Sequence, residues 1–205
     1  MQEFGQQDVQ IEQQDYAYQG FYQLKQLRLR QRLFEGGWSG SFQRELCVRQ
    51  DAVGILLYDA NSQQFALVEQ MRVGVLGRQQ SPWLLELVAG LLDKSDESEA
   101  DVAVREAKEE AGLEVLAVEP MLRYFVSPGG STEHFSLFCG KVDLSQTSTG
   151  VFGLAEENEN IRLHIVSVEQ ALDLFAQGKV NNSMTFIALQ WFMLNRDRLD
   201  AHWRD

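Results

Sequence analysis

Apolar and polar residues alternate along the first part of the chain in a way that predicts strands. Residues 16–34 should form strands, and within them Leu27, Leu29 and Leu33 alternate at a period of two with Arg28, Arg30 and Arg32. Gly36-Gly37 indicates a turn, and residues 41–48 should form another strand. The Gln-rich start, roughly the first 15 residues, should be loosely ordered. A small antiparallel sheet therefore precedes the main domain, and because about three strands are marginally stable alone, it should pack against another surface.

The larger part of the chain mixes strand and helix patterns. Apolar runs predict strands at residues 53–58, 65–71, 83–88, 115–126, 134–142 and 161–166. Helical periodicity predicts helices around residues 100–111, 168–177 and 185–198, the second closed by Gly178 and the third with Phe186, Leu189, Phe192 and Met193 on its apolar side. A polar, acidic loop is expected at 143–160. We expect an α/β fold, an α/β/α sandwich with a mixed sheet, in residues 51–205, after an antiparallel β-subdomain in residues 1–50.

Composition and charge argue against several kinds of binding partner and compartment. Hydrophobic residues make up 44% of the 205 residues, and 18 basic against 30 acidic residues give a net charge of −12. This charge argues against nonspecific nucleic-acid binding. The N-terminus has no secretory pattern and no apolar run reaches about 18 residues, so we expect a cytoplasmic protein with no membrane partner. Cys47 and Cys139 lie in apolar-alternating stretches and should be reduced core residues.

Three carboxylates lie close together on one predicted helix. Glu109 and Glu110 both fall beside Glu106 when the helix turns every 3.6 residues. Lys108 should project away, which would leave the carboxylates without a neutralising partner on their own helix. At ~5 Å and an effective dielectric constant of ~20, each such pair repels by roughly 3 kcal/mol. Hard oxygen ligands clustered in this way suit Mg²⁺ or Mn²⁺.

The segment around these carboxylates resembles the Nudix box. That pattern is Gly, five residues, Glu, seven residues, then Arg-Glu-apolar-x-Glu-Glu-x-Gly-apolar, and residues 97–113 match it. Gly90 departs from the pattern, because six residues separate it from Glu97. Either the loop carries one extra residue or Asp96 replaces the glutamate. The extra residue is favoured, because Glu97 keeps its distance to Arg105, with which it could pair.

Other stretches resemble the ADP-ribose branch of the bacterial Nudix hydrolases. They lie at residues 20–21, 44–45, 68–72, 82–86, 89–90, 127–130 and 153–159. Pro128, within Ser-Pro-Gly-Gly, points to this branch most specifically. The resemblance implies Mg²⁺-dependent hydrolysis of the diphosphate of ADP-ribose to AMP and ribose 5-phosphate.

The resemblance also implies catalytic and metal-binding residues. Two or more Mg²⁺ ions, or Mn²⁺, would be held in each site by the Ala89 carbonyl, Glu106, Glu109 and Glu110. Glu157 is the expected general base, on a loop that can swing over substrate, and Glu159 is the second choice. Residue type alone also allows a merely solvated acidic loop, and an interior box glutamate could be the base instead. Arg105 completes the catalytic set.

Candidate substrate contacts are spread along the chain. Arg44 and Arg72 offer planar guanidinium forks for a diphosphate, although each could instead form a salt bridge at a sheet edge. Phe21 could stack on a purine or pack in a core. Gly130 and Glu133 are implied by the resemblance alone.

The resemblance further implies a homodimer whose active sites include the N-terminal strands. Two other functions stay open. The chain could cleave another nucleotide sugar, such as GDP-mannose or ADP-glucose. It could also be a Nudix-fold sensor that binds ADP-ribose without cleaving it, although the intact Glu106, Glu109 and Glu110 argue against this, as does the lack of a second, DNA-binding domain.

Overall fold

The structure, a computed structural model, describes residues 3–94 and 96–204. Contacts divide them into two compact units. The first unit holds the described residues up to Asp51 together with residues 125–134, and the second holds the rest. The domain boundary expected near residue 51 remains a prediction, because compact units need not fold independently.

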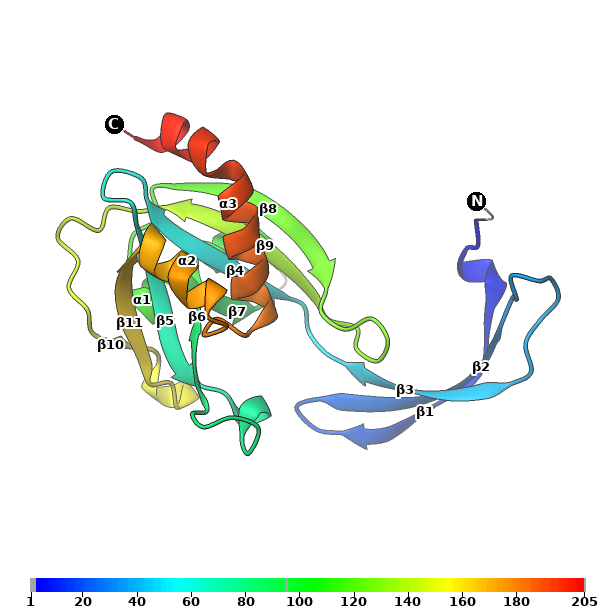
Figure 1. Cartoon of the computed structure of the whole chain (residues 1–205). Helices are drawn as coiled ribbons and strands as arrows, with labels where there is room; N and C mark the ends of the chain where they lie inside the picture. The colour runs from blue at the N-terminus through cyan, green and yellow to red at the C-terminus, as the bar shows by residue number, and fades with distance from the viewer. Residues whose placement is uncertain (1–2, 95, 205) are drawn as a thin grey trace. The chain divides into compact units, whose positions relative to one another are not determined.

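The first unit is built on a three-stranded antiparallel sheet. A short 3-10 helix (Gln6–Asp8) leads into strands β1 (Val9–Gln19), β2 (Gln23–Gln31) and β3 (Phe42–Val48), which lie in the order β1-β2-β3 (Figure 1). The expectation of a loosely ordered start is wrong from Val9 onward, because β1 pairs with β2 from its first residue. Residues 1–2, which the expectation also covered, lie outside the described residues. Every residue of β1 is nevertheless exposed, whereas Leu27 of β2 is buried. The sheet therefore has little core of its own.

Residues 125–134 join the first unit through hydrogen bonds to the end of β3. The backbone N–H of Cys47 donates to the Gly130 carbonyl at 2.8 Å, and the N–H of Thr132 donates to the Cys47 carbonyl at 3.1 Å. The segment also brings Glu133 into an ion pair with Arg49, with 2.9 Å between Nη1 and Oε2. These contacts fix the loop that contains Ser-Pro-Gly-Gly to the N-terminal sheet.

The second unit contains an eight-stranded mixed sheet. Its strands are β4 (Ala52–Asp59), β5 (Gln64–Met71), β6 (Trp83–Glu86), β7 (Val88–Leu91), β8 (Ala117–Phe125), β9 (His134–Lys141), β10 (Val151–Phe152) and β11 (Ile161–Ser167). The order is β10-β11-β5-β4-β9-β8, with β6 beside β5 and β7 beside β4. Every residue of the central strand β4 is buried, and β4 runs parallel to β9 and antiparallel to β5.

Helices cover both faces of this sheet (Figure 1). Ile55 of β4 shares one core with α1 (Glu99–Ala111), whereas its neighbour Leu56 shares the other core with α2 (Val168–Ala176) and α3 (Ser183–Trp203). Successive residues of a strand point to opposite faces, so α1 lies on one face and the other two helices lie on the opposite face. The predicted α/β/α sandwich is confirmed.

Helix α3 begins two residues before and ends five residues after the predicted range 185–198. Leu189 and Phe192 of its predicted apolar side are buried, but the other two residues are not. Phe186 and Met193 are 39% and 44% exposed, while Thr185 and Ala188 are fully buried. The small side chains of Thr185 and Ala188 let the helix pack closely against the sheet. After α2, Gly178 has φ of +70° and its N–H donates to the Phe175 carbonyl at 3.0 Å, as expected of a closing glycine.

The two cysteines are free thiols. Cys139 is fully buried, as expected of a core residue, whereas Cys47 is only half-buried. Within the described part of the chain, no helix is long and apolar enough to cross a membrane.

Candidate active site

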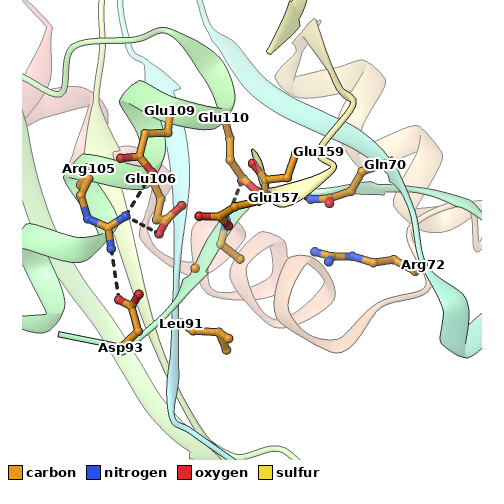
Figure 2. A pocket seen from close by; sticks show the side chains of 12 residues that line it. Gln70, Arg72, Leu91, Asp93, Arg105, Glu106, Glu109, Glu110, Glu157 and Glu159 are labelled. Carbon is orange, nitrogen blue, oxygen red and sulfur yellow. Dashed lines mark hydrogen bonds and ion pairs between the residues drawn. The ribbon is translucent and has the colours of Figure 1, made fainter. Parts of the chain in front are cut away.

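One polar cavity of about 250 Å³ gathers most of the candidate site residues of the second unit (Figure 2). It lies where β5, β7, α1 and the loop after β10 meet. The residues that line it are Gln70, Arg72, Ala89, Gly90, Leu91, Asp93, Arg105, Glu106, Glu109, Glu110, Glu157 and Glu159. Eight of these were expected from the sequence, so residues up to 87 positions apart, from Arg72 to Glu159, converge on one site.

Helix α1 is held at both ends by local sequence. The Ser98 hydroxyl accepts from the Asp101 N–H at 3.2 Å while the Asp101 carboxylate accepts from the Ser98 N–H at 3.2 Å, which forms a capping box. At the other end, Gly112 has φ of +67° and its N–H donates to the Lys108 carbonyl. Ala103 and Ala107 of α1 are fully buried in the core, while Glu106, Glu109 and Glu110 of the same helix line the cavity.

Arg105 neutralises several of these carboxylates. Its Nη1 lies 2.9 Å from Glu106 Oε1 and 3.1 Å from Glu109 Oε2, and its Nε lies 3.1 Å from Glu97 Oε2. The expectation that the helix offers no cationic partner is therefore wrong, because the long side chain of Arg105 reaches both one residue and one turn along its own helix. The expected pairing of Glu97 with Arg105 is present.

Glu110 is the most buried carboxylate of the cavity, with 2% of its surface exposed. Its Oε2 accepts from the Ala89 N–H at 3.1 Å, and its Oε1 accepts from Gln70 Nε2 at 3.4 Å. Burial raises the pKa of Glu110 to about 8, and the nearby Glu106 carboxylate adds to the rise. Burial likewise raises the pKa of Glu106 to about 7, against the opposing effect of Arg105. Both groups would ionise more readily beside a bound cation.

The loop after β10 brings Glu157 and Glu159 to the cavity in different ways. Glu157 ends a short 3-10 helix (Ala155–Glu157) and its carboxylate lines the cavity. Glu159 Oε2 accepts from the Leu154 N–H at 3.0 Å, which closes the loop on itself. Gly153, with φ of +100°, allows this closure because a Cβ there would meet Glu159 Cβ at 2.6 Å. Glu159 thus also maintains the loop that carries Glu157.

Arg72 follows the end of β5 and makes two hydrogen bonds to one carboxylate oxygen. Its Nε and Nη2 lie 2.9 and 2.7 Å from Glu86 Oε2. Glu86 is 2% exposed, and burial raises its pKa while Arg72 opposes that rise. The sequence pattern alone indicates no role for Glu86 or Gln70. The available signal for Glu86 was a single acidic residue among the apolar residues of β6.

Four further candidate substrate contacts belong to the first unit. Phe21 is 79% exposed, with its ring 4.9 Å from that of Tyr22. The Arg44 guanidinium lies 4.6 Å from the Phe42 ring. Gly130 and Glu133 are engaged by Cys47 and Arg49, as described above. The structure assigns these four to the unit of β1–β3 and the other eight to the cavity.

The donor chemistry of the cavity fits a hard divalent cation. Oxygen ligands predominate, and the two arginines that line the cavity do not balance its six carboxylates. Among residues 3–94 and 96–204, however, no three acidic, His or Cys side chains are arranged to hold a metal ion as they stand. The contacts explain this, because Arg105 binds Glu106 and Glu109 while Glu110 accepts from the Ala89 N–H. A metal ion would have to replace Arg105 on those carboxylates.

The fold and the cavity agree with the family that comparison identifies. The profile of the NUDIX domain matches residues 48–186, and the chain belongs to the Nudix family. A solved structure described as "Crystal structure of ADP compounds hydrolase" shares the fold, with a TM-score of 0.72, 18% identity, and coverage of 99% of this chain and 100% of that chain.

Two of the relatives are similar to this chain along almost their whole length. The ADP-ribose pyrophosphatase of Haemophilus influenzae is 42% identical over 207 residues, which cover 100% of this chain and 94% of that protein. The ADP-ribose pyrophosphatase of Escherichia coli (strain K12) is 43% identical over 200 residues, or 98% and 95% of the two chains. The GDP-mannose pyrophosphatase of Escherichia coli O1:K1 / APEC is 32% identical and covers 74% of this chain and 78% of that protein.

Proposed function

We propose that this chain hydrolyses the diphosphate of ADP-ribose to AMP and ribose 5-phosphate, using Mg²⁺ or Mn²⁺, with two or more ions in each site. The observation that carries the proposal is the convergence of five glutamates and two arginines on one cavity. Arginines suit a diphosphate, and clustered glutamates suit the cations that neutralise it. The choice of ADP-ribose rests on the full-length similarity to the two pyrophosphatases that bear its name.

Glu106, Glu109, Glu110 and the Ala89 carbonyl would hold the metal ions. When bound, these ions would supply charge neutralisation at the phosphates and lower the pKa of a coordinated water. Arg72 lines the same cavity and would bind a phosphate oxygen through its free N–H groups. Arg105 would keep Glu106 and Glu109 in place while substrate is absent.

Glu157 would act as the general base. It would take a proton from the attacking water while the oxygen of that water bonds to one phosphorus, and the bond from this phosphorus to the bridging oxygen breaks. The leaving phosphate keeps the electron pair. Arg72 would help to hold the diphosphate in line with this water, since phosphoryl transfer depends mainly on positioning and charge.

Hydrolysis of another nucleotide sugar is the alternative favoured by a specific observation, the 32% identity to a GDP-mannose pyrophosphatase. Purified protein should be supplied with Mg²⁺ and with ADP-ribose, ADP-glucose or GDP-mannose in separate reactions, and the products separated by chromatography. Fastest turnover of ADP-ribose, with AMP and ribose 5-phosphate released, supports the proposal. If ADP-glucose or GDP-mannose is turned over faster, that nucleotide sugar is the substrate and the proposal is wrong. If ADP-ribose binds but is not turned over, the protein is a sensor.

We also propose a cytoplasmic homodimer that binds neither nucleic acid nor membranes. The fully exposed strand β1 supports the dimer, because it carries apolar side chains such as Ile11 and Tyr18 that are 59% and 62% exposed. The free thiols support a reducing compartment. The net charge of −12 opposes nucleic-acid binding.

A further inference from the structure

Glu86 and Arg72 form an asymmetric pair at the wall of the cavity. The Glu86 carboxylate is almost completely buried, whereas 40% of the Arg72 side chain is exposed. Two N–H groups of Arg72, on Nε and Nη2, point at one oxygen of Glu86. A guanidinium has five N–H groups, so about three stay available to a ligand. Figure 2 shows the Arg72 guanidinium reaching into the cavity beside Gln70.

Arg72 has other partners within electrostatic reach. The carboxylates of Glu110 and Glu159 line the same cavity as Arg72 and would attract its guanidinium when they are ionised. Without its hydrogen bonds to Glu86, Arg72 would move toward these carboxylates, because opposite charges attract strongly in a partly buried site. In that position its guanidinium would occupy the space that a cation or a phosphate needs. The structure shows it bonded to Glu86 instead.

We propose that Glu86 is a positioning residue that holds Arg72 at the cavity wall, keeps it off Glu110 and Glu159, and presents its remaining N–H groups to a phosphate of the substrate. This inference rests on the proposed function for the identity of the substrate. Glu86 itself touches no reacting atom. Its carboxylate bonds to Arg72 and does not line the cavity, so it acts only through Arg72.

The kinetic test replaces Glu86 by Gln, which preserves the shape of the side chain and removes its charge. In E86Q, Arg72 should move toward the cavity carboxylates. The KM for ADP-ribose should rise about 10-fold or more, and the Mg²⁺ concentration for half-maximal activity should rise with it. Glu69→Gln is the matched control, because Glu69 is a glutamate on β5, the strand beside β6, but it pairs with His164 and does not line the cavity. Its KM should be unchanged.

A double variant separates positioning from any independent role of Glu86. If Glu86 acts through Arg72, adding E86Q to R72Q should cause no further loss of activity. A further loss of tenfold would contradict the proposal. The second readout needs neither metal nor substrate: the Arg72 Nε–H should give a slowly exchanging ¹H–¹⁵N signal in the metal-free protein, identified by its absence in R72K and lost in E86Q.

Failure of this inference can be distinguished from failure of the proposed function. If the unaltered protein does not cleave ADP-ribose, the function is wrong, and the Nε–H signal still tests the position of Arg72. If the unaltered protein is active and E86Q retains its KM and its Nε–H signal, the positioning role is wrong. Should E86Q fail to fold, E86D replaces it. Its shorter side chain cannot reach both N–H groups, so an intermediate rise in KM is expected, and an unchanged KM would overturn the proposal.

Discussion

Gly90 and Glu106 approach each other so closely that no side chain fits between them. A Cβ built on Gly90 would lie 2.2 Å from the carboxyl carbon of Glu106, well inside van der Waals contact. Because β7 and α1 are packed at this point, only glycine lets the Glu106 carboxylate lie over the strand. The glycine of the box thus determines where one of the expected metal ligands lies.

Gly90→Ala should therefore lower activity by about 10²-fold, because the added methyl group displaces the Glu106 carboxylate by an ångström or more. Steady-state hydrolysis with saturating Mg²⁺ measures the effect. Gly40→Ala is the control, since nothing lies within 4 Å of a Cβ at Gly40 and its activity should match the unaltered protein. Full activity in G90A would show that the position of Glu106 is not needed for turnover.

Glu110 makes the stability of the metal-free protein depend on pH. Its pKa rises from 4.5 in the unfolded chain to about 8 in the fold, so the folded state binds the proton more tightly. This contribution to stability is present in full below about pH 4.5 and is lost as the pH rises through 8. The free energy of unfolding should fall by on the order of 2–4 kcal/mol across this range.

Glu110→Gln should remove most of that loss, because glutamine stays neutral. Urea unfolding in a chelating buffer at pH 5 and pH 8.5 should show E110Q more stable than the unaltered protein only at the higher pH. The pH dependence of the free energy of unfolding that remains in E110Q should come from Glu106, whose pKa is raised to about 7. Turnover should meanwhile fall about 10²-fold or more, since an expected metal ligand is lost. Equal pH dependence in both proteins would contradict this account of Glu110.

Glu157→Gln should lower kcat by about 10²-fold or more and change KM little, since a general base acts mainly in the transition state. Glu159→Gln should lower kcat less, because the Oε1 of glutamine can still accept the hydrogen bond from the Leu154 N–H that closes the loop. Steady-state kinetics on both variants decides between them. If E159Q abolishes turnover while E157Q leaves both parameters unchanged, Glu159 is the base.

The elements that sequence predicts best are those with at least one buried face. Strand β4 is a continuous apolar run, and it is buried throughout. Strand β1 was missed over its first half because Gln-rich residues that are exposed on both faces show no alternation. The pairing of β1 comes instead from backbone hydrogen bonds to β2, which leave no trace in side-chain type.

The same distinction applies to the cavity. The spacing of the box predicts Glu106, Glu109 and Glu110, because a helix places residues three and four apart side by side. The partners Glu86 and Gln70 come from neighbouring strands, and their proximity depends on the register between β5 and β6. No local spacing encodes that register. The contact of Arg105 with Glu109 was missed because it depends on a side-chain conformation.

The full-length protein should be a homodimer whose N-terminal sheet contributes to the interface. The sheet buries little of its own surface, and the candidate contacts Phe21 and Arg44 lie on it. A symmetric dimer would repeat one patch on both chains and should bury more than ~2,000 Å² if the monomer is not stable alone. Light scattering should give twice the mass of one chain. Deletion of residues 1–48 should give a monomer that does not hydrolyse ADP-ribose.

A point variant tests the same interface without removing a strand. Ile11→Glu adds a charge to an exposed apolar position of β1, so the sheet should persist while the dimer dissociates about 10-fold or more readily. Gln13→Glu is the control, because it changes charge on the same strand at a position that is already polar. Hydrolysis of ADP-ribose should fall with the fraction of dimer in I11E when the protein is diluted. A monomeric mass for the fully active, unaltered enzyme would rule out a site shared between subunits.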